Sequence, residues 1–145
     1  MNVRPSALII VRDRILTLRY KYNDTEVFAL PGGNPDAGEC LNVALERELQ
    51  EELGVTSDIN EMVISGEVIW REIQKETLHI VFDTKINGSP TLNPTETTAL
   101  EVVWLSIEDL DKKILYPNVG KQIQEFARQM IPSGHIGVID QPYIK

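Results

Sequence analysis

The chain has one cysteine, few basic residues and no long hydrophobic run, and each shortage excludes something. Cys40 cannot form a disulfide bond within the chain, and the first residues lack the apolar run and cleavage site of a secretory signal, so we expect a reducing, cytoplasmic environment. The 14 basic residues against 22 acidic ones give a net charge of -8, which disfavours binding to nucleic acid polymers. No stretch approaches the ~20 apolar residues that cross a bilayer, so we expect no membrane contact.

The length and composition fit one compact domain covering residues 1–145, because a chain of this size buries about two-thirds of the surface that its unfolded form exposes. No repeat, low-complexity tract or linker divides it. The charge is unevenly distributed: residues 1–21 hold five basic side chains against Asp13, whereas residues 36–61 hold eight acidic side chains against Arg47 alone. That density of carboxylates requires bound cations or full solvation.

The local patterns predict several strands and one strong helix. Runs rich in β-branched and aromatic residues predict strands over 7–11, 15–20, 26–30, 61–70, 77–86 and 99–105, with an edge strand over 136–139. Arg12-Asp13-Arg14 is expected to connect the first two as a hairpin, and Pro31-Gly32-Gly33 to end the third, because proline removes a hydrogen-bond donor. Residues 40–53 contain no Gly or Pro and precede Gly54, which predicts a helix with a left-handed C-terminal cap.

Two helical segments are predicted later in the chain. Ser106 with Asp109 resembles a capping box that opens a short turn. Pro117 is expected to start a helix with apolar positions at helical spacing: Ile123, Phe126, Ala127 and Met130. One acidic helix after a glycine turn, several strands and a late helix together predict an α+β fold in which a mixed β-sheet is sandwiched between helices.

The helix over 40–53 turns glutamates toward its buried side. On a helical wheel its leucines define one apolar arc, with Glu48 and Glu52 inside that arc and Glu51 at its edge. Unpaired buried carboxylates are costly, and like charges three or four residues apart repel. A hard divalent cation with oxygen ligands is the simplest partner, since Arg47 can neutralise only part of the cluster. The alternative is that Glu48 and Glu52 lie at the rim of the sheet and reach into water.

The spacing around this helix resembles the signature of the Nudix hydrolases. The chain matches G-x5-E-x7-R-E-U-x-E-E-x-G-U, where U is a bulky aliphatic residue, without a departure: Gly33, Glu39, Arg47-Glu48-Leu49, Glu51-Glu52 and Gly54-Val55. Leu30-Pro31-Gly32-Gly33 is also how this box usually begins. The resemblance implies a Nudix fold and a Mg²⁺-dependent enzyme, with Mn²⁺ as a substitute, that hydrolyses a pyrophosphate bond in a nucleoside diphosphate linked to another moiety.

The resemblance also implies a role for each matching position. Metal ligands are expected at Gly32, through its backbone carbonyl, and at Glu48, Glu51 and Glu52; Glu48 is alternatively the general base. Arg47 and Glu39 are expected to pair and orient these carboxylates. Bound Mg²⁺ would bridge the diphosphate and lower the pKa of the water that attacks phosphorus in line, without a covalent enzyme intermediate.

Six residues outside the box are candidates for substrate binding: Arg19, Lys21, Trp70, Glu96, Glu101 and Asn118. The two cations suit phosphates, and Trp70, like Tyr20, suits stacking on a base. Glu96 and Glu101 lie in the distal region from which related enzymes often bring one more metal ligand or general base, and Glu101 alternatively reads the nucleobase. Asn118 follows a Tyr-Pro pair that resembles the segment near the base in mutator-type triphosphatases. The alternatives are solvated charge, core packing for the aromatics, and helix capping for Asn118.

The leading hypothesis is an enzyme that acts on a nucleoside triphosphate and releases pyrophosphate or a monophosphate product. ADP-ribose or another nucleotide sugar is the alternative substrate, and a non-catalytic nucleotide-binding Nudix module is the alternative of another class. The proline of many ADP-ribose enzymes, expected near Trp70, and the tyrosine of many dinucleoside polyphosphate enzymes, near Glu72, are both missing. The expected partner is a small nucleotide, with a homodimer as an option. His79 is expected to be a satisfied structural histidine, and His135 to lie in a loop.

Overall fold

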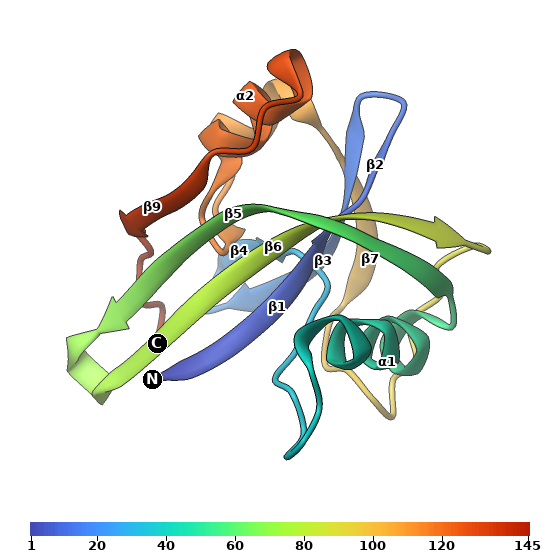
Figure 1. Cartoon of the computed structure of the whole chain (residues 1–145). Coiled ribbons are helices and arrows are strands. Elements are labelled where there is room, and N and C mark those ends of the chain that lie inside the picture. Colours follow the sequence, from blue (N-terminus) through green and yellow to red (C-terminus); the bar gives the residue numbers. More distant parts are fainter.

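The computed structural model describes residues 1–145, which form two β-sheets and two α-helices (Figure 1). Sheet A has the strand order β1-β6-β5-β9, with β1 at Asn2–Leu8, β5 at Thr56–Trp70, β6 at Lys75–Asn87 and β9 at Gly134–Val138. Sheet B has the order β2-β3-β4-β8, with β7 also paired to β3: β2 at Ile10–Val11, β3 at Arg14–Tyr22, β4 at Thr25–Ala29, β7 at Glu101–Ser106 and β8 at Leu115–Tyr116. The helices are α1 at Leu41–Leu53 and α2 at Gly120–Gln129, and the 3-10 turns are η1 at Arg71–Ile73 and η2 at Ile107–Lys112.

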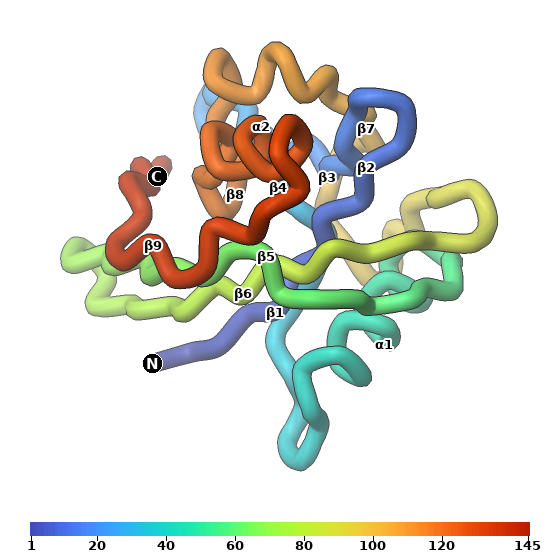
Figure 2. The backbone as a smooth tube through the Cα atoms, turned by 45° about the horizontal axis from the view of Figure 1, so that its top comes forward, coloured from blue at the N-terminus to red at the C-terminus, as the bar shows by residue number.

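Sheet A lies between the two helices, each of which covers a separate hydrophobic core (Figure 2). On one side, leucines of α1 pack with Ala7 and Ile9. On the other side, Phe126 and Ile123 of α2 pack with Leu8 and with residues of sheet B. The predicted α+β class and the mixed sheet between helices are confirmed. The second sheet was not predicted, because strand partners distant in sequence leave no local pattern.

The first predicted strand, over 7–11, is wrong in its extent. β1 begins at Asn2 and ends at Leu8, pairing in parallel with β6 at the edge of sheet A, where the missing N–H of Pro5 is tolerated. Ile10–Val11 instead pairs with β3 in sheet B. The predicted hairpin is confirmed: Arg12 and Asp13 adopt φ angles of 51° and 63°, the left-handed values of a tight two-residue connection.

The helix α1 ends as its sequence predicts. Gly54 adopts a φ of 68°, and its N–H donates to the carbonyl of Gln50, which closes a left-handed cap. Leu45, Leu49 and Leu53 are completely buried against sheet A. This packing fixes the rotation of α1 about its own axis and therefore the direction in which its glutamates point.

Three predictions near the end of the chain are wrong. The η2 turn does follow Ser106, but the Ser106 side chain makes no capping hydrogen bond. Pro117 does not start a helix: α2 begins three residues later, at Gly120, where a Cβ would lie 2.9 Å from the carbonyl oxygen of Leu110 and only glycine fits. Met130 does not pack on the core but is 64% exposed, since α2 ends before it. The predicted edge strand near the C-terminus is confirmed as β9.

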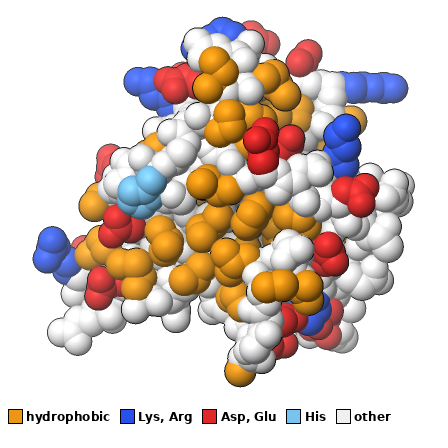
Figure 3. Space-filling view, viewed as in Figure 1, with side chains coloured by type: hydrophobic (Ala, Val, Ile, Leu, Met, Phe, Trp, Pro, Cys, Tyr) orange, Lys and Arg blue, Asp and Glu red, His pale blue; other side chains and the backbone are white.

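Hydrophobic side chains gather over the middle of the face seen in Figure 1, with charged side chains mainly around its margin (Figure 3). None of the helices has the length and apolar character that crossing a membrane requires. The expected homodimer remains a prediction.

Candidate functional site

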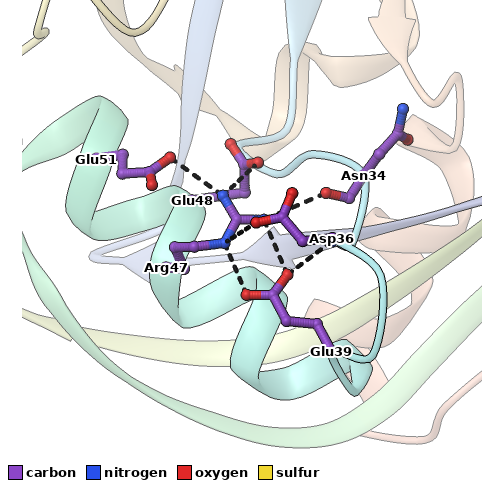
Figure 4. A network of polar contacts seen from close by, with 6 residues as sticks. All are labelled: Asn34, Asp36, Glu39, Arg47, Glu48 and Glu51. Atoms are coloured by element: carbon purple, nitrogen blue, oxygen red, sulfur yellow. Dashed lines mark hydrogen bonds and ion pairs between the residues drawn. The ribbon is translucent and has the colours of Figure 1, made fainter.

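The predicted site is built where the loop after β4 returns along α1 (Figure 4). Arg47 lies at its centre. It donates from Nε to Glu39 at 2.7 Å and from Nη2 to the same carboxylate at 3.0 Å, while Nη2 also reaches the backbone oxygen of Asn34 at 3.3 Å. The remaining nitrogen, Nη1, lies 3.1 Å from both Glu48 and Glu51. One guanidinium thus joins the loop to two carboxylates of the helix.

These contacts shift the pKa values of Glu39 and Arg47 in the directions that stabilise the charged form of each side chain. The side-chain hydrogen bond from Arg47, followed by the backbone N–H of Asp36, lowers the pKa of Glu39. The hydrogen bond to Glu39, followed by that to Glu48, raises the pKa of Arg47 against the effect of burial. Both side chains therefore stay charged at neutral pH, so the connection between loop and helix is ionic.

Glu48 is held in a restricted space beside Gly33. Its side chain is only 17% exposed, and burial raises its pKa although Arg47 opposes that shift. A Cβ at Gly33 would lie 2.4 Å from the Glu48 Cδ atom. Glycine is therefore required at position 33 to leave room for the carboxyl group.

Glu52 is the carboxylate of the cluster whose negative charge is least stabilised by neighbouring groups. Burial, and next the charge of Glu48, raise the pKa of Glu52 to about 7. Its Oε2 atom is buried and has no hydrogen-bond partner. At least this oxygen of Glu52 does not reach into water, which favours the inward, cation-binding interpretation over the solvated alternative. Glu51, at the edge of the cluster, is 40% exposed and is paired with Arg47.

The donor set is suited to a hard divalent cation, although it is not a preassembled cage. No three acidic, histidine or cysteine side chains are gathered closely enough to form a ready metal site. The buried oxygen of Glu52 nevertheless has no hydrogen-bond donor, and all the candidate ligands are oxygens, which Mg²⁺ prefers. Gly32 forms a bridge with Ser6, and a Cβ there would lie 2.3 Å from the Pro5 carbonyl oxygen, so backbone approaches backbone closely at this position.

A cavity of about 430 Å³ adjoins Gly32. Five aromatic side chains line it: Tyr20, Tyr22, Trp70, Tyr116 and Tyr143. We call it the aromatic cavity. The rings are ordered by mutual packing, because Trp70 stacks on Tyr116 at 6.0 Å between centroids and meets the edge of Tyr143 at 5.3 Å. Trp70, predicted as a stacking residue, therefore lies in the wall of a pocket with flat apolar surfaces.

The sequence patterns missed most of this cavity. Arg4, Lys75 and the residues Gln141 to Ile144 also line it, yet they come from β1, β6 and the C-terminal tail. The tail gives no sequence signal for such a position. Arg4 did carry one, since alternation along β1 places it on the same face as Leu8, which packs in the core on the sheet B side.

The other predicted substrate-binding residues do not line the aromatic cavity. Arg19 forms ion pairs with Glu101 at 2.7 Å and Glu26 at 3.3 Å, so two of the candidates are bonded to each other. Lys21 is exposed. Glu96 shares a shallow hollow with Glu52, close enough to raise the pKa of Glu52 slightly.

Asn118 lies outside the aromatic cavity, and its side chain is engaged by the backbone. Its Oδ1 accepts from the N–H of Leu115 at 3.1 Å, and its Nδ2 donates to the carbonyl of Asp140 at 2.9 Å. These bonds connect β8 to the C-terminal tail. The geometry supports a structural role for Asn118, and base recognition by this residue remains a prediction.

The two histidines differ from their predicted surroundings. His79 is not satisfied: it is completely buried, neither ring nitrogen has a partner, and burial lowers its pKa to about 3, so it is neutral. His135 lies in β9 rather than in a loop, between Ser65 at 2.8 Å and Glu67 at 3.2 Å. Cys40 is exposed and precedes α1.

Comparison with known proteins identifies a family and a relative of this chain. Residues 2–127 match the family model of the NUDIX domain. A protein of Bacillus subtilis (strain 168) named "Putative 8-oxo-dGTP diphosphatase" is 28% identical over 126 residues, which are 87% of this chain and 80% of that protein.

Solved structures share the fold. A MutT NUDIX hydrolase from Burkholderia pseudomallei has a TM-score of 0.72 and 23% identity, covering 85% of this chain and 96% of that one. An ADP-ribose pyrophosphatase from Streptococcus suis 89-1591 has a TM-score of 0.66 and 19% identity, covering 92% and 97%. At these identities the two structures establish a common architecture.

Proposed function

Because the chain belongs to the Nudix hydrolase family, we propose that it uses bound Mg²⁺ to hydrolyse a pyrophosphate bond of a nucleoside triphosphate. Members of this family act on small nucleotide substrates and generally use divalent metal ions. The products would be pyrophosphate and a nucleoside monophosphate, or another pair formed by cutting one anhydride bond. The observation that carries the proposal is the partnerless, buried Oε2 of Glu52 beside the carboxylates that Arg47 holds.

The metal would be held by Glu48, Glu51 and Glu52, with the backbone carbonyl of Gly32 as a further donor. A carboxylate cluster alone repels a diphosphate, and a bound cation reverses the sign of that field. When bound, Mg²⁺ supplies charge neutralisation on the phosphate oxygens and a more acidic water. A cation nearby would favour the charged form of Glu52, whose pKa is raised to about 7 by burial and next by the charge of Glu48.

The protein side chains would position the reaction and handle its proton. Arg47, fixed by Glu39, orients Glu48 and Glu51 through its Nη1 atom. Glu48 is the candidate general base, because burial raises its pKa and so increases its affinity for a proton from water. Space beside Gly33 allows that carboxyl group to keep its place.

The nucleoside would occupy the aromatic cavity. Planar bases stack on aromatic faces, and Gly32 belongs both to the cavity wall and to the segment that precedes the glutamate cluster. A base in the cavity would therefore place its phosphates toward α1. The Bacillus subtilis relative, whose name describes a diphosphatase of an oxidised deoxyguanosine triphosphate, supports a triphosphate substrate over ADP-ribose.

The test is turnover of a nucleotide panel by the purified protein. Nucleoside triphosphates, ADP-ribose and a nucleotide sugar are each incubated with Mg²⁺, with Mn²⁺ or with a chelator, and the products are separated by chromatography. We expect triphosphates to be cleaved with either metal and not with chelator. Binding of nucleotides without turnover of any of them would indicate the non-catalytic module instead.

A further inference from the structure

Arg4 connects the aromatic cavity with the glutamate cluster. It lies on β1 opposite His79 of β6, and it lines the cavity. Its Cζ atom is 5.1 Å from the centre of the Tyr116 ring, and the charges of Glu52 and Glu48 stabilise its protonated form. A nucleotide that fills the cavity and reaches the glutamates must therefore pass beside this side chain.

The guanidinium has hydrogen-bonding capacity that the protein leaves unused. An arginine carries five N–H donors. The only protein acceptor engaged is the backbone oxygen of Leu30, 3.0 Å from Nη2, and Nη1 is enclosed without any partner. Burial lowers the pKa of Arg4 from its ordinary value, while Tyr116 and then Glu52 oppose that effect. A desolvated donor without an acceptor costs free energy. An oxygen atom of a ligand in the cavity would recover it once the Arg4 side chain turns its enclosed Nη1 toward the cavity.

Apart from tyrosine hydroxyl groups, the cavity offers few side-chain acceptors to a ligand. No aspartate or glutamate is among its 13 lining residues, and Arg4 and Lys75 are its two cations. The amide of Gln141 is engaged at both ends, with Oε1 accepting from the N–H of Asn118 and Nε2 donating to the carbonyl of Leu115. The edge of a bound base thus meets cationic donors, without a free carboxylate or amide oxygen to receive an amino group.

We propose that Arg4 is a specificity-determining residue that donates a hydrogen bond to a keto oxygen of the substrate base. The inference rests on the proposed function and deepens it, because it names the class of base: 6-oxopurines and 4-oxopyrimidines are preferred to adenine and cytosine. An amino group in place of the keto oxygen would direct N–H donors at a cationic donor and leave both unpaired. Sites built around one polar contact discriminate strongly against analogues that lack it.

Inosine triphosphate and ATP test this preference, because their purines carry oxygen and an amino group, respectively, at position six. The measurement is kcat/KM with Mg²⁺ for the wild type, for Arg4→Met, and for Arg128→Met as a control at an exposed arginine of α2. We expect the wild type to prefer inosine triphosphate by about tenfold or more. Arg4→Met should lower kcat/KM for inosine triphosphate about 10- to 100-fold more than that for ATP, because only inosine triphosphate loses the hydrogen bond to its keto oxygen. The control should keep the wild-type ratio, and UTP against CTP should repeat the pattern.

Several outcomes would overturn the inference. Equal cleavage of both purine nucleotides by the wild type would overturn the inference without any variant. It would leave the proposed function intact. An equal loss on both substrates in Arg4→Met would show that Arg4 acts on the phosphates or on folding. Circular dichroism melting identifies a folding defect. If Arg4→Met is defective in folding, Arg4→Lys replaces it as the test: it keeps the charge but not the planar fork, and it should show a reduced preference for inosine triphosphate over ATP. Absence of turnover on every nucleotide would contradict the proposed function itself.

Discussion

Arg47 and Glu39 form a two-pronged ion pair between α1 and the loop before it, with Nε 2.7 Å from Oε2 and Nη2 3.0 Å from Oε1. The same guanidinium donates from Nη1 to Glu48 and Glu51. One planar group therefore sets the distance between the loop and two carboxylates. A lysine ammonium can make only part of these contacts, because it is a point donor without a fixed fork.

Arg47→Lys is expected to lower kcat/KM on the best nucleotide by about 10- to 100-fold, as is usual when a partner that orients metal ligands is lost. The melting temperature should fall as well, because the loop loses its ionic connection to α1. Steady-state kinetics and circular dichroism measure the two effects. Arg128→Lys, on the exposed face of α2, is the matched control. Wild-type kinetics in Arg47→Lys would exclude the orienting role.

Glu52→Gln is expected to change how the stability of the metal-free protein depends on pH. Burial raises the pKa of Glu52 from 4.5 to about 7, so the folded state holds this proton more tightly than the unfolded chain. The resulting stabilisation is complete below pH ~4.5 and is lost as the pH rises through about 7. Between about pH 5 and pH 8 the wild type should therefore lose on the order of 1–3 kcal/mol relative to Glu52→Gln. Urea unfolding in a chelator measures the difference.

The same variant should fold but turn over substrate at least about 100-fold more slowly, since glutamine cannot supply an anionic ligand. Glu46→Gln, at an exposed position of the same helix, should keep both the wild-type activity and the wild-type pH profile. Saturating Mg²⁺ should flatten the pH dependence of the wild type alone. A fully active Glu52→Gln protein would rule out Glu52 as a metal ligand.

Gly33→Ala is expected to impair activity more than stability. The new Cβ would lie 2.4 Å from the Glu48 Cδ atom, at the end of a side chain that can rotate away. The cost to the fold should be about 1 kcal/mol or less, whereas the displaced carboxyl group should reduce kcat by about tenfold or more. Chemical denaturation and kcat on one nucleotide separate the two effects. Loss of folding without a selective loss of kcat would contradict the prediction.

Trp70→Ala is expected to raise KM for nucleotides about tenfold with a smaller change in kcat, because stacking on a base is worth roughly 1–3 kcal/mol. The side chain forms one wall of the aromatic cavity, and its Nε1 also holds the tail through the carbonyl of Gln141 at 3.1 Å. Trp70→Phe retains the ring and should recover most of the affinity. An unchanged KM in Trp70→Ala would place the base elsewhere.

The parts of the site that lie close together in sequence were predictable. The helix over residues 41–53 followed from its composition and from Gly54, and its leucine arc fixed the direction of Glu48 and Glu52. The approach of Arg47 to Glu39 followed from the family resemblance. These features depend on one helix and one loop, whose geometry is set mainly by local backbone preferences.

The aromatic cavity could not be predicted, because its walls meet only in three dimensions. Arg4 and Lys75 come from different strands at the same end of the parallel β1–β6 ladder, more than 70 residues apart in sequence, and Tyr143 comes from the C-terminal tail. His79 was expected to have partners because buried imidazoles usually do. Its burial against Tyr116, with ring centroids 4.8 Å apart, is an aromatic contact that no spacing rule reveals.

Successive residues at the end of β1 face opposite cores. Ala7, and Ile9 just after the strand, belong to the core with the α1 leucines, whereas Leu8 belongs to the core on the sheet B side, the face on which Arg4 also lies. Inserting or deleting one residue between Arg4 and Ala7 would reverse that alternation and turn Arg4 to the opposite face of sheet A, away from the cavity. A substitution at position 4 keeps this alternation, whereas a change in length does not. Under the role that we propose for Arg4, exchanges at position 4 are expected to change the preferred base, whereas the number of residues between positions 4 and 9 is expected to stay constant.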